Sequence, residues 1–154
     1  MAGRRDLIRM TDDEVEEFLH GRHTMNVASH GPDGSIHLVA MWYGFLNGNP
    51  AIETFAKSQK VQNLRRDPRV TVLVEDGEAY GELRGVELVG HAVIHDEPAA
   101  LMTVVRDVVA RYFEVDDPEE AEATAVLMAA KRVAVEIVPD KVVSWDHTKL
   151  AGTY

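Results

Sequence analysis

The sequence predicts a mainly β protein of the α+β class, in which antiparallel strands curl into a small barrel. Between residues 25 and 95, apolar and polar residues alternate in several short segments, with the period of a half-buried strand. Turn sequences rich in Gly, Asn and Pro separate these segments. Gly85 and Gly90 lie within a long extended run and mark bends or bulges. Such bends let a sheet curl until it closes, so a barrel is favoured over a flat sheet.

Length, composition and charge limit the function. The chain has 154 residues, 45% of them hydrophobic, which is enough for one domain with a sizeable core. We therefore expect a single domain over residues 1–154, with residues 1–10 as an N-terminal extension and residues 147–154 as a C-terminal tail. Sixteen basic and twenty-six acidic residues give a net charge of −10, which argues against nucleic acid or a membrane surface as a partner.

The chain has no cysteine. This excludes disulfides, thiolate nucleophiles, iron–sulfur clusters and the common structural zinc sites. The sequence also lacks an apolar stretch of about 18 residues, and its first residues do not resemble a signal peptide. We expect a soluble cytoplasmic protein.

The N-terminal half is expected to contain one helix and three or four strands, depending on whether residues 43–46 break the second strand. Residues 11–14 (TDDE) form a capping box that starts a short helix. Residues 25–28 and 36–42 are the arms of a hairpin around the Gly-Pro-Asp-Gly turn at residues 31–34. A strand over residues 51–56 follows an Asn-Gly-Asn-Pro turn.

The middle of the chain is expected to alternate helix and strand. Ser58 caps a helix over residues 59–66, which Asp67-Pro68 ends because proline disfavours helical geometry in the residue before it. A strand from Arg69 to Val74 and an extended run over residues 80–95 follow.

Two helices and a hairpin are expected to complete the chain. Asp96 is expected to cap a helix with one apolar stripe, and Asp117-Pro118 to start another. The stripe consists of Leu101, Val104, Val105, Val108, Val109 and Tyr112. Residues 132–138 and 142–145 are expected to pair as a closing hairpin around a Pro139-Asp140 turn.

A candidate anion site lies where the strand over residues 51–56 leads into the next helix. Lys57 and Lys60 flank the helix start, where the helix dipole disfavours cations by a few tenths of a kcal/mol unless an anion offsets them. The hydroxyls of Thr54 and Ser58 and the free N–H groups of the helix start complete a phosphate cradle. The alternative is that both lysines point into solvent.

Other catalytic constellations are not favoured. His91 and His95 lie about 13 Å apart in an extended run, too far to share one ion, so we expect no metal site. The chain contains neither a G-x-S-x-G nucleophile elbow nor a dinucleotide or P-loop motif. A chain with an anion site and no catalytic groups of its own is typical of a protein whose cofactor performs the chemistry.

Residues 57–70 (KSQKVQNLRRDPRV) resemble the S-x-K-x-x-N-L-x-x-D-P-R-V segment of the FMN-binding split β-barrel superfamily, the pyridoxamine phosphate oxidase-like proteins. Asp33-Gly34-Ser35, Gly90-His91-Ala92 and Ile137-Val138-Pro139 extend the resemblance over residues 11–146. The Trp145-Asp146 pair makes the chain similar to the branch that uses the deazaflavin coenzyme F420.

The resemblance implies a split β-barrel with Greek-key-like antiparallel strands and a homodimer whose cofactor lies between the subunits. It places the cofactor ring beside Val39, Ala40, Met41 and Trp42 and the phosphate on Thr54, Lys57, Ser58 and Lys60. It also places Asn63 either at the cofactor or in support of the loop.

Two departures from the family pattern argue against vitamin B6 oxidation. Gln59 stands where the classical oxidases have arginine, and residues 146–154 lack their arginine-rich substrate motif. F420 carries additional glutamates, for which Lys57, Arg65, Arg66 and Lys149 are candidate partners.

The expected function is therefore an F420-dependent oxidoreductase that transfers hydride between reduced F420 and a conjugated organic acceptor, a small molecule. Tyr43 and His37 are candidate proton donors. The alternatives are an FMN-dependent oxidoreductase on the same fold and a non-enzymatic protein that binds F420, haem or another tetrapyrrole.

Overall fold

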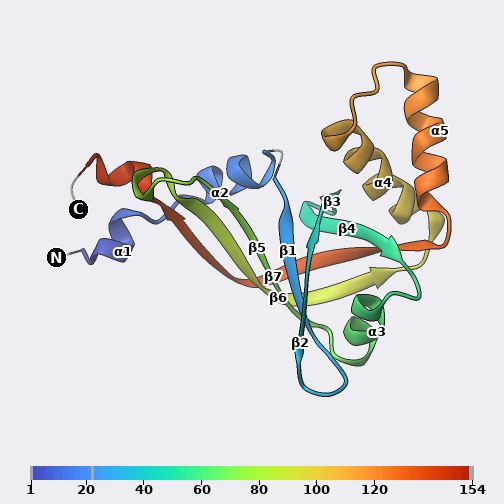
Figure 1. The fold of residues 1–154 in the computed structure, drawn as a ribbon, viewed down its shortest axis with the longest axis horizontal. Coiled ribbons are helices and arrows are strands. Elements are labelled where there is room, and N and C mark those ends of the chain that lie inside the picture. Colours follow the sequence, from blue (N-terminus) through green and yellow to red (C-terminus); the bar gives the residue numbers. More distant parts are fainter. Residues whose placement is uncertain (1, 22, 153–154) are drawn as a thin grey trace.

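One curled antiparallel sheet forms the body of the protein (Figure 1). The computed structural model describes residues 2–21 and 23–152, and within them seven strands pair in the order β2-β1-β5-β6-β7-β4-β3. The strands are β1 (Met25–His30), β2 (Ile36–Met41), β3 (Gly44–Leu46), β4 (Asn49–Phe55), β5 (Arg69–Asp76), β6 (Arg84–His95) and β7 (Arg132–Asp146). The helices are α1 (Arg4–Leu7), α2 (Asp12–Leu19), α3 (Gln59–Arg66), α4 (Pro98–Tyr112) and α5 (Pro118–Ala129), with short 3-10 turns η1 (Tyr80–Glu82) and η2 (His147–Leu150). The expected α+β fold is confirmed.

The connection between β2 and β3 explains why the sheet curls. These strands are its two opposite edges, yet only Trp42 and Tyr43 separate them in the sequence. Three residue steps span at most about 11 Å, so the edges must come close together. The expected curl of the sheet is therefore confirmed, as a half-barrel whose edge strands β2 and β3 do not pair.

The core fills the inside of this curl. The inward valines of β1, β5, β6 and β7 form it together with Phe18 and Leu19 of α2 and Val61 and Leu64 of α3. The two helices therefore cap the interior from different ends (Figure 1). Helix α4 packs outside the sheet against β3, β4 and β7. As a result β4 is buried on both faces from Pro50 to Thr54.

Three helix starts agree with the expected caps. Thr11 Oγ1 accepts from the Glu14 N–H at 3.2 Å, and the Glu14 carboxylate accepts from the Thr11 N–H at 3.0 Å. The Ser58 hydroxyl accepts from the Val61 N–H at 3.4 Å, and Asp117 caps α5 through the Glu120 N–H at 3.0 Å.

The expected closing hairpin is wrong. Residues 132–146 form one continuous strand, and Pro139-Asp140 is a bulge rather than a turn. Val89 pairs with Lys141 and Gly90 pairs with Pro139, so the extra residue opposite them is Asp140. Gly90 permits this because a Cβ there would lie 2.0 Å from the Val138 carbonyl oxygen. The expected bulge at Gly90 is confirmed.

No bulge occurs at Gly85, where the glycine instead makes room for the Trp145 ring. Gly85 pairs with Trp145 without a register shift, and a Cβ on it would lie 2.2 Å from the indole ring. Glycine is needed there because the Trp145 ring lies against the backbone. The extended run is also shorter than expected, since residues 80–82 form the turn η1.

The expected cap at Asp96 is wrong as well. The N-cap of α4 is Glu97, whose side chain makes no capping bond, and Pro98 occupies the first turn. Asp96 instead forms an ion pair with Arg65 at 2.9 Å.

The chain ends contain short helical turns. Residues 4–7 of the expected N-terminal extension form α1, and residues 147–150 of the expected tail form η2. Residue 1 and residues 153–154 of these segments lie outside the described residues. Within residues 2–21 and 23–152, no helix combines the length and apolar character needed to cross a membrane.

Arg111 connects α4 to the C-terminal end of α2. Its guanidinium donates to the carbonyl oxygens of His20 at 3.3 Å and Gly21 at 2.9 Å. It also lies over the rings of Tyr43 and Phe45, 4.7 and 5.1 Å from their centroids. A cation favours the C-terminal end of a helix and the faces of aromatic rings.

Arg111→Met is expected to lower the free energy of unfolding by about 2 kcal/mol or more, because it removes charge-assisted hydrogen bonds and cation–π contacts together. The matched control is Arg106→Met on the same helix, whose ion pair with Glu122 is exposed, and little change is expected. Urea unfolding measures both. Equal destabilisation by the two variants would contradict the role given to Arg111.

Candidate functional site

The residues expected to form a phosphate cradle lie at the junction of β4 and α3, where several of them contact one another. Lys60 Nζ donates to Thr54 Oγ1 at 2.9 Å, and Thr54 itself is buried. The Ser58 hydroxyl is used as the cap of its own helix. Lys57 is exposed. The structure therefore brings Thr54 and Lys60 together and leaves Lys57 at the surface.

Two further residues belong to this cluster and were missed from the sequence. The pairing of β4 with β7 brings Arg132 beside Glu53, and the Arg132 guanidinium forms a close ion pair with the Glu53 carboxylate. The same guanidinium lies over the ring of Phe55, 4.4 Å from its centroid. Arg132 lies 79 residues beyond Glu53, so local spacing gave no signal that the two meet.

Burial shifts the pKa values of two groups in this cluster. Glu53 is only 6% exposed, and burial raises the pKa of its carboxyl although Arg132 opposes the change. Burial lowers the pKa of the Lys60 ammonium, and the nearby Glu53 charge opposes that change. Lys60 and Arg132 together carry two positive charges against the single negative charge of Glu53. The cluster therefore keeps a net positive charge in a partly desolvated place.

The cluster fits a phosphate group. The Arg132 Nε is buried without a hydrogen-bond partner in the described part of the chain. A buried N–H without an acceptor is unfavourable and favours an anion that accepts from it. Arg132, Lys60 and the Thr54 hydroxyl are all donors suited to phosphate oxygens. We define the anion cluster as Glu53, Thr54, Lys60 and Arg132. Thr54, which holds Lys60, pairs with Val133 of the inner core, whereas Glu53, which holds Arg132, pairs with Ala134 on the face that α4 covers.

The four residues expected beside the cofactor ring face in opposite directions. Val39 and Met41 pack against the core, whereas Ala40 and Trp42 are exposed on the outside of β2 and the segment that follows it. This alternation is the ordinary geometry of a strand. Only the side chains of Ala40 and Trp42 can face a ring on the outer surface.

Trp42 lies on an aromatic base. Its indole stacks on Tyr112 with ring centroids 5.1 Å apart and an angle of 8° between the planes. Phe113 meets it edge-on at 5.6 Å. Trp42 remains 46% exposed, so the indole is held in place and still open to solvent.

Asn63 supports the fold in this chain. It is completely buried, and its amide donates to the Ser29 hydroxyl of β1 at 3.2 Å. Its carbonyl oxygen accepts from Gln59 at 2.7 Å and from Arg66 at 3.3 Å. These bonds fasten α3 to β1, which agrees with the supporting role left open by the sequence.

The two candidate proton donors, Tyr43 and His37, differ in burial and in hydrogen bonding. Tyr43 is fully buried and donates to the Leu19 carbonyl oxygen, and burial raises its pKa far above the ordinary value. It therefore holds the connection between β2 and β3 to the C-terminal end of α2. His37 is partly buried on β2, and its Nδ1 has no hydrogen-bond partner among the described residues.

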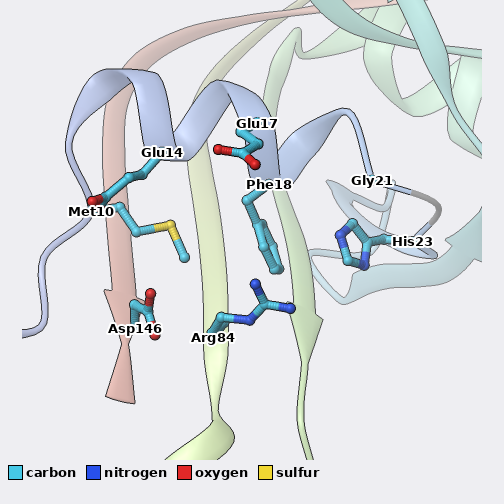
Figure 2. A pocket seen from close by; sticks show the side chains of 8 residues that line it. All are labelled: Met10, Glu14, Glu17, Phe18, Gly21, His23, Arg84 and Asp146. Carbon is cyan, nitrogen blue, oxygen red and sulfur yellow. The ribbon is translucent and has the colours of Figure 1, made fainter. Parts of the chain in front are cut away.

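A separate hollow of about 380 Å³ lies under α2 (Figure 2). Phe18 forms its centre, stacked on His23 at 4.4 Å and covered by the Arg84 guanidinium at 5.2 Å. Two of its charges are paired within the protein, Arg84 with Asp76 and Glu14 with Lys149. Because these charges are already paired, the hollow is a weaker candidate for binding an anion than the anion cluster is.

Metal ligands are not gathered in the described part of the chain. No group of three or more His, Cys, Asp or Glu side chains is arranged to hold an ion there. His91 instead contacts Asp140 at 3.3 Å, and His95 lies between Glu97 and Glu136 at 3.0 and 2.9 Å.

Comparisons with known proteins identify relatives. The family profile described as pyridoxamine 5'-phosphate oxidase matches residues 11–146. A conserved hypothetical protein from Mycobacterium tuberculosis is 44% identical in sequence with a TM-score of 0.91, over 99% of this chain and 95% of that chain. No curated protein matches.

More distant solved structures share the fold. An F420 reductase is 22% identical with a TM-score of 0.62, over 82% of this chain and 94% of that chain. The heme storage protein HutZ from Vibrio cholerae is 14% identical with a TM-score of 0.65, over 86% of this chain and 94% of that chain.

Proposed function

Because the chain belongs to the pyridoxamine 5'-phosphate oxidase family, we propose that it is an oxidoreductase that uses coenzyme F420 and a conjugated organic acceptor. The anion cluster is the observation that carries this proposal. It offers two cations, a hydroxyl and an unpaired buried N–H at the end of β4, and F420 carries a phosphate. A fold neighbour is named as an F420 reductase.

In the proposed site the protein binds the cofactor and orients it toward the acceptor. Lys60, Arg132 and Thr54 hold the phosphate, and Lys57 reaches the tail carboxylates. Trp42, fixed on Tyr112, offers an apolar surface for the ring. When bound, the reduced deazaflavin would supply a hydride to the acceptor. The protein then contributes by holding the two reactants in a productive geometry.

The cations suggested for the F420 tail differ in their availability. Arg65 pairs with Asp96, Arg66 donates to the His30 carbonyl oxygen, and Lys149 pairs with Glu14. Lys57 is exposed. Because the anion cluster would suit the phosphate of FMN equally well, an FMN-dependent oxidoreductase is the second candidate.

We also propose that a second copy of the chain covers β2. Among the described strands, β2 pairs only with β1, so its other edge is open. Its outward residues are apolar, with Ile36 57% and Leu38 67% exposed, and Trp42 continues the row. An open edge strand with an apolar outer face favours association. A homodimer would cover this row beside the proposed ring position at Trp42.

Lys60→Met is expected to weaken F420 binding by about tenfold or more, because it removes a charge-assisted contact with the phosphate. Lys141→Met, which removes an exposed lysine of β7, is the matched control and should bind as the wild type does. Titration of purified protein with F420 and FMN side by side, by calorimetry, measures the affinities. Tight FMN binding without F420 binding would favour the second candidate, and equal affinities in the two variants would contradict the assigned phosphate site.

Leu38→Glu is expected to convert the dimer into a monomer, because it places a charge in the apolar row of β2. Leu127→Glu on α5 is the control, since Leu127 is also an exposed leucine, at 78%. Sedimentation velocity measures the molar mass. A wild-type monomer, or a dimer that persists in Leu38→Glu, would contradict the proposed interface.

A further inference from the structure

Glu53 is an unusual residue for an anion-binding site. Its carboxylate is almost completely buried and occupies the guanidinium of Arg132, one of the two cations available for a phosphate. Lys60 is the second cation near it. The cluster therefore contains its own anion. A phosphate that binds Arg132 must compete with the Glu53 carboxylate.

We propose that Glu53 is a built-in competitor that a phosphorylated ligand must displace, so that this carboxylate sets the affinity of the chain for the phosphate. The ligand class rests on the proposed function, whereas the competition rests on the geometry of Glu53, Arg132 and Lys60. Glu53 has no role in the transfer of hydride. It controls how easily the hydrogen-bond donors of the anion cluster become available to bind a ligand.

The displaced carboxylate has few other partners. Helix α4 covers this face of the sheet with the apolar side chains of Val104 and Val108. Across β7 in the same register lies His95 of β6. That histidine is held by Glu136 and Glu97. A Glu53 side chain that loses Arg132 to a ligand would thus be a buried charge without a counterion, which is strongly unfavourable.

Such a carboxylate is expected to take up a proton. Burial already raises the pKa of Glu53 while Arg132 is beside it, and a bound phosphate would raise it further by adding negative charge nearby. The complex then binds more protons than the free protein. By linkage, binding of a phosphorylated ligand must weaken as the pH rises.

The decisive variant is Glu53→Gln, which keeps the shape and an oxygen acceptor for Arg132 but removes the charge. We expect it to bind F420 about tenfold more tightly than the wild type at pH 7.5, since one nearby unit charge changes an affinity by at least that much in a partly buried site. The matched control is Glu136→Gln. Glu136 is equally buried, at 6% exposed, on the neighbouring strand, but its partners are Asn47, Asn49 and His95. No change in affinity is expected for this control.

Proton uptake by the wild-type protein tests the same idea without a substitution. Calorimetric titration with F420 in two buffers of different ionisation enthalpy should show uptake of a fraction of a proton up to about one per site, and Glu53→Gln should abolish it. The phosphodiester of F420 does not titrate near neutral pH, and its other ionisable groups are the same in both titrations, so the difference in uptake between the wild type and Glu53→Gln is the proton taken up by Glu53. Unchanged or weaker binding by Glu53→Gln, or the same uptake in both proteins, would overturn the proposal.

Stabilisation by sulfate tests the competition by Glu53 independently of the proposed function. If F420 does not bind the wild type, the proposed function fails, and sulfate, which stays fully ionised, then tests the competition alone. The rise in melting temperature on adding sulfate should be larger for Glu53→Gln than for the wild type and Glu136→Gln. Equal rises in all three proteins would overturn the proposal.

Discussion

The two-residue connection between β2 and β3 is the constraint on which the rest of the structure depends. It joins the opposite edges of a seven-stranded sheet within the described residues, so the sheet has to curl. Curling gives the valine-rich interior that α2 and α3 close. It also makes β4 and β7 neighbours on an outer surface that α4 covers. The anion cluster lies on these neighbouring strands and the helix that follows β4, so the chain geometry that curls the sheet also builds the site.

The chemistry of the anion cluster comes from where it lies. The same groups at an open surface would be hydrated, and their interactions would be weak. Under partial burial, Arg132 and Lys60 favour the charged form of Glu53, and the Glu53 carboxylate favours the charged form of Lys60, which the Arg132 charge opposes. A surplus of one positive charge and an unpaired Arg132 Nε make an anionic ligand favourable, while Glu53 limits how strongly it binds. A site of this kind suits a cofactor that is held by its phosphate and presents its ring to an acceptor.

Much of the fold follows from local patterns. The capping box at Thr11 and the Ser58 cap each depend on residues close in sequence, and both are confirmed. The bulge expected at Gly90 is also confirmed, although its partner strand is distant in the sequence. The closing hairpin was wrong because Pro139-Asp140 suits a turn and a bulge equally well, and the choice depends on Gly90 of the partner strand. At the site, Thr54 and Lys60 lie six residues apart and were predicted to meet. Glu53 and Arg132 were missed because only the pairing of β4 with β7 brings them together.

The most direct test of this account is a crystal structure of the protein with F420 bound. Phosphate oxygens are expected within hydrogen-bond distance of Lys60 Nζ and the Arg132 guanidinium, with the Glu53 side chain turned away from Arg132. The ring should lie against Trp42. A phosphate bound elsewhere, such as in the hollow around Phe18 and Arg84, with the ion pair between Glu53 and Arg132 intact, would contradict it.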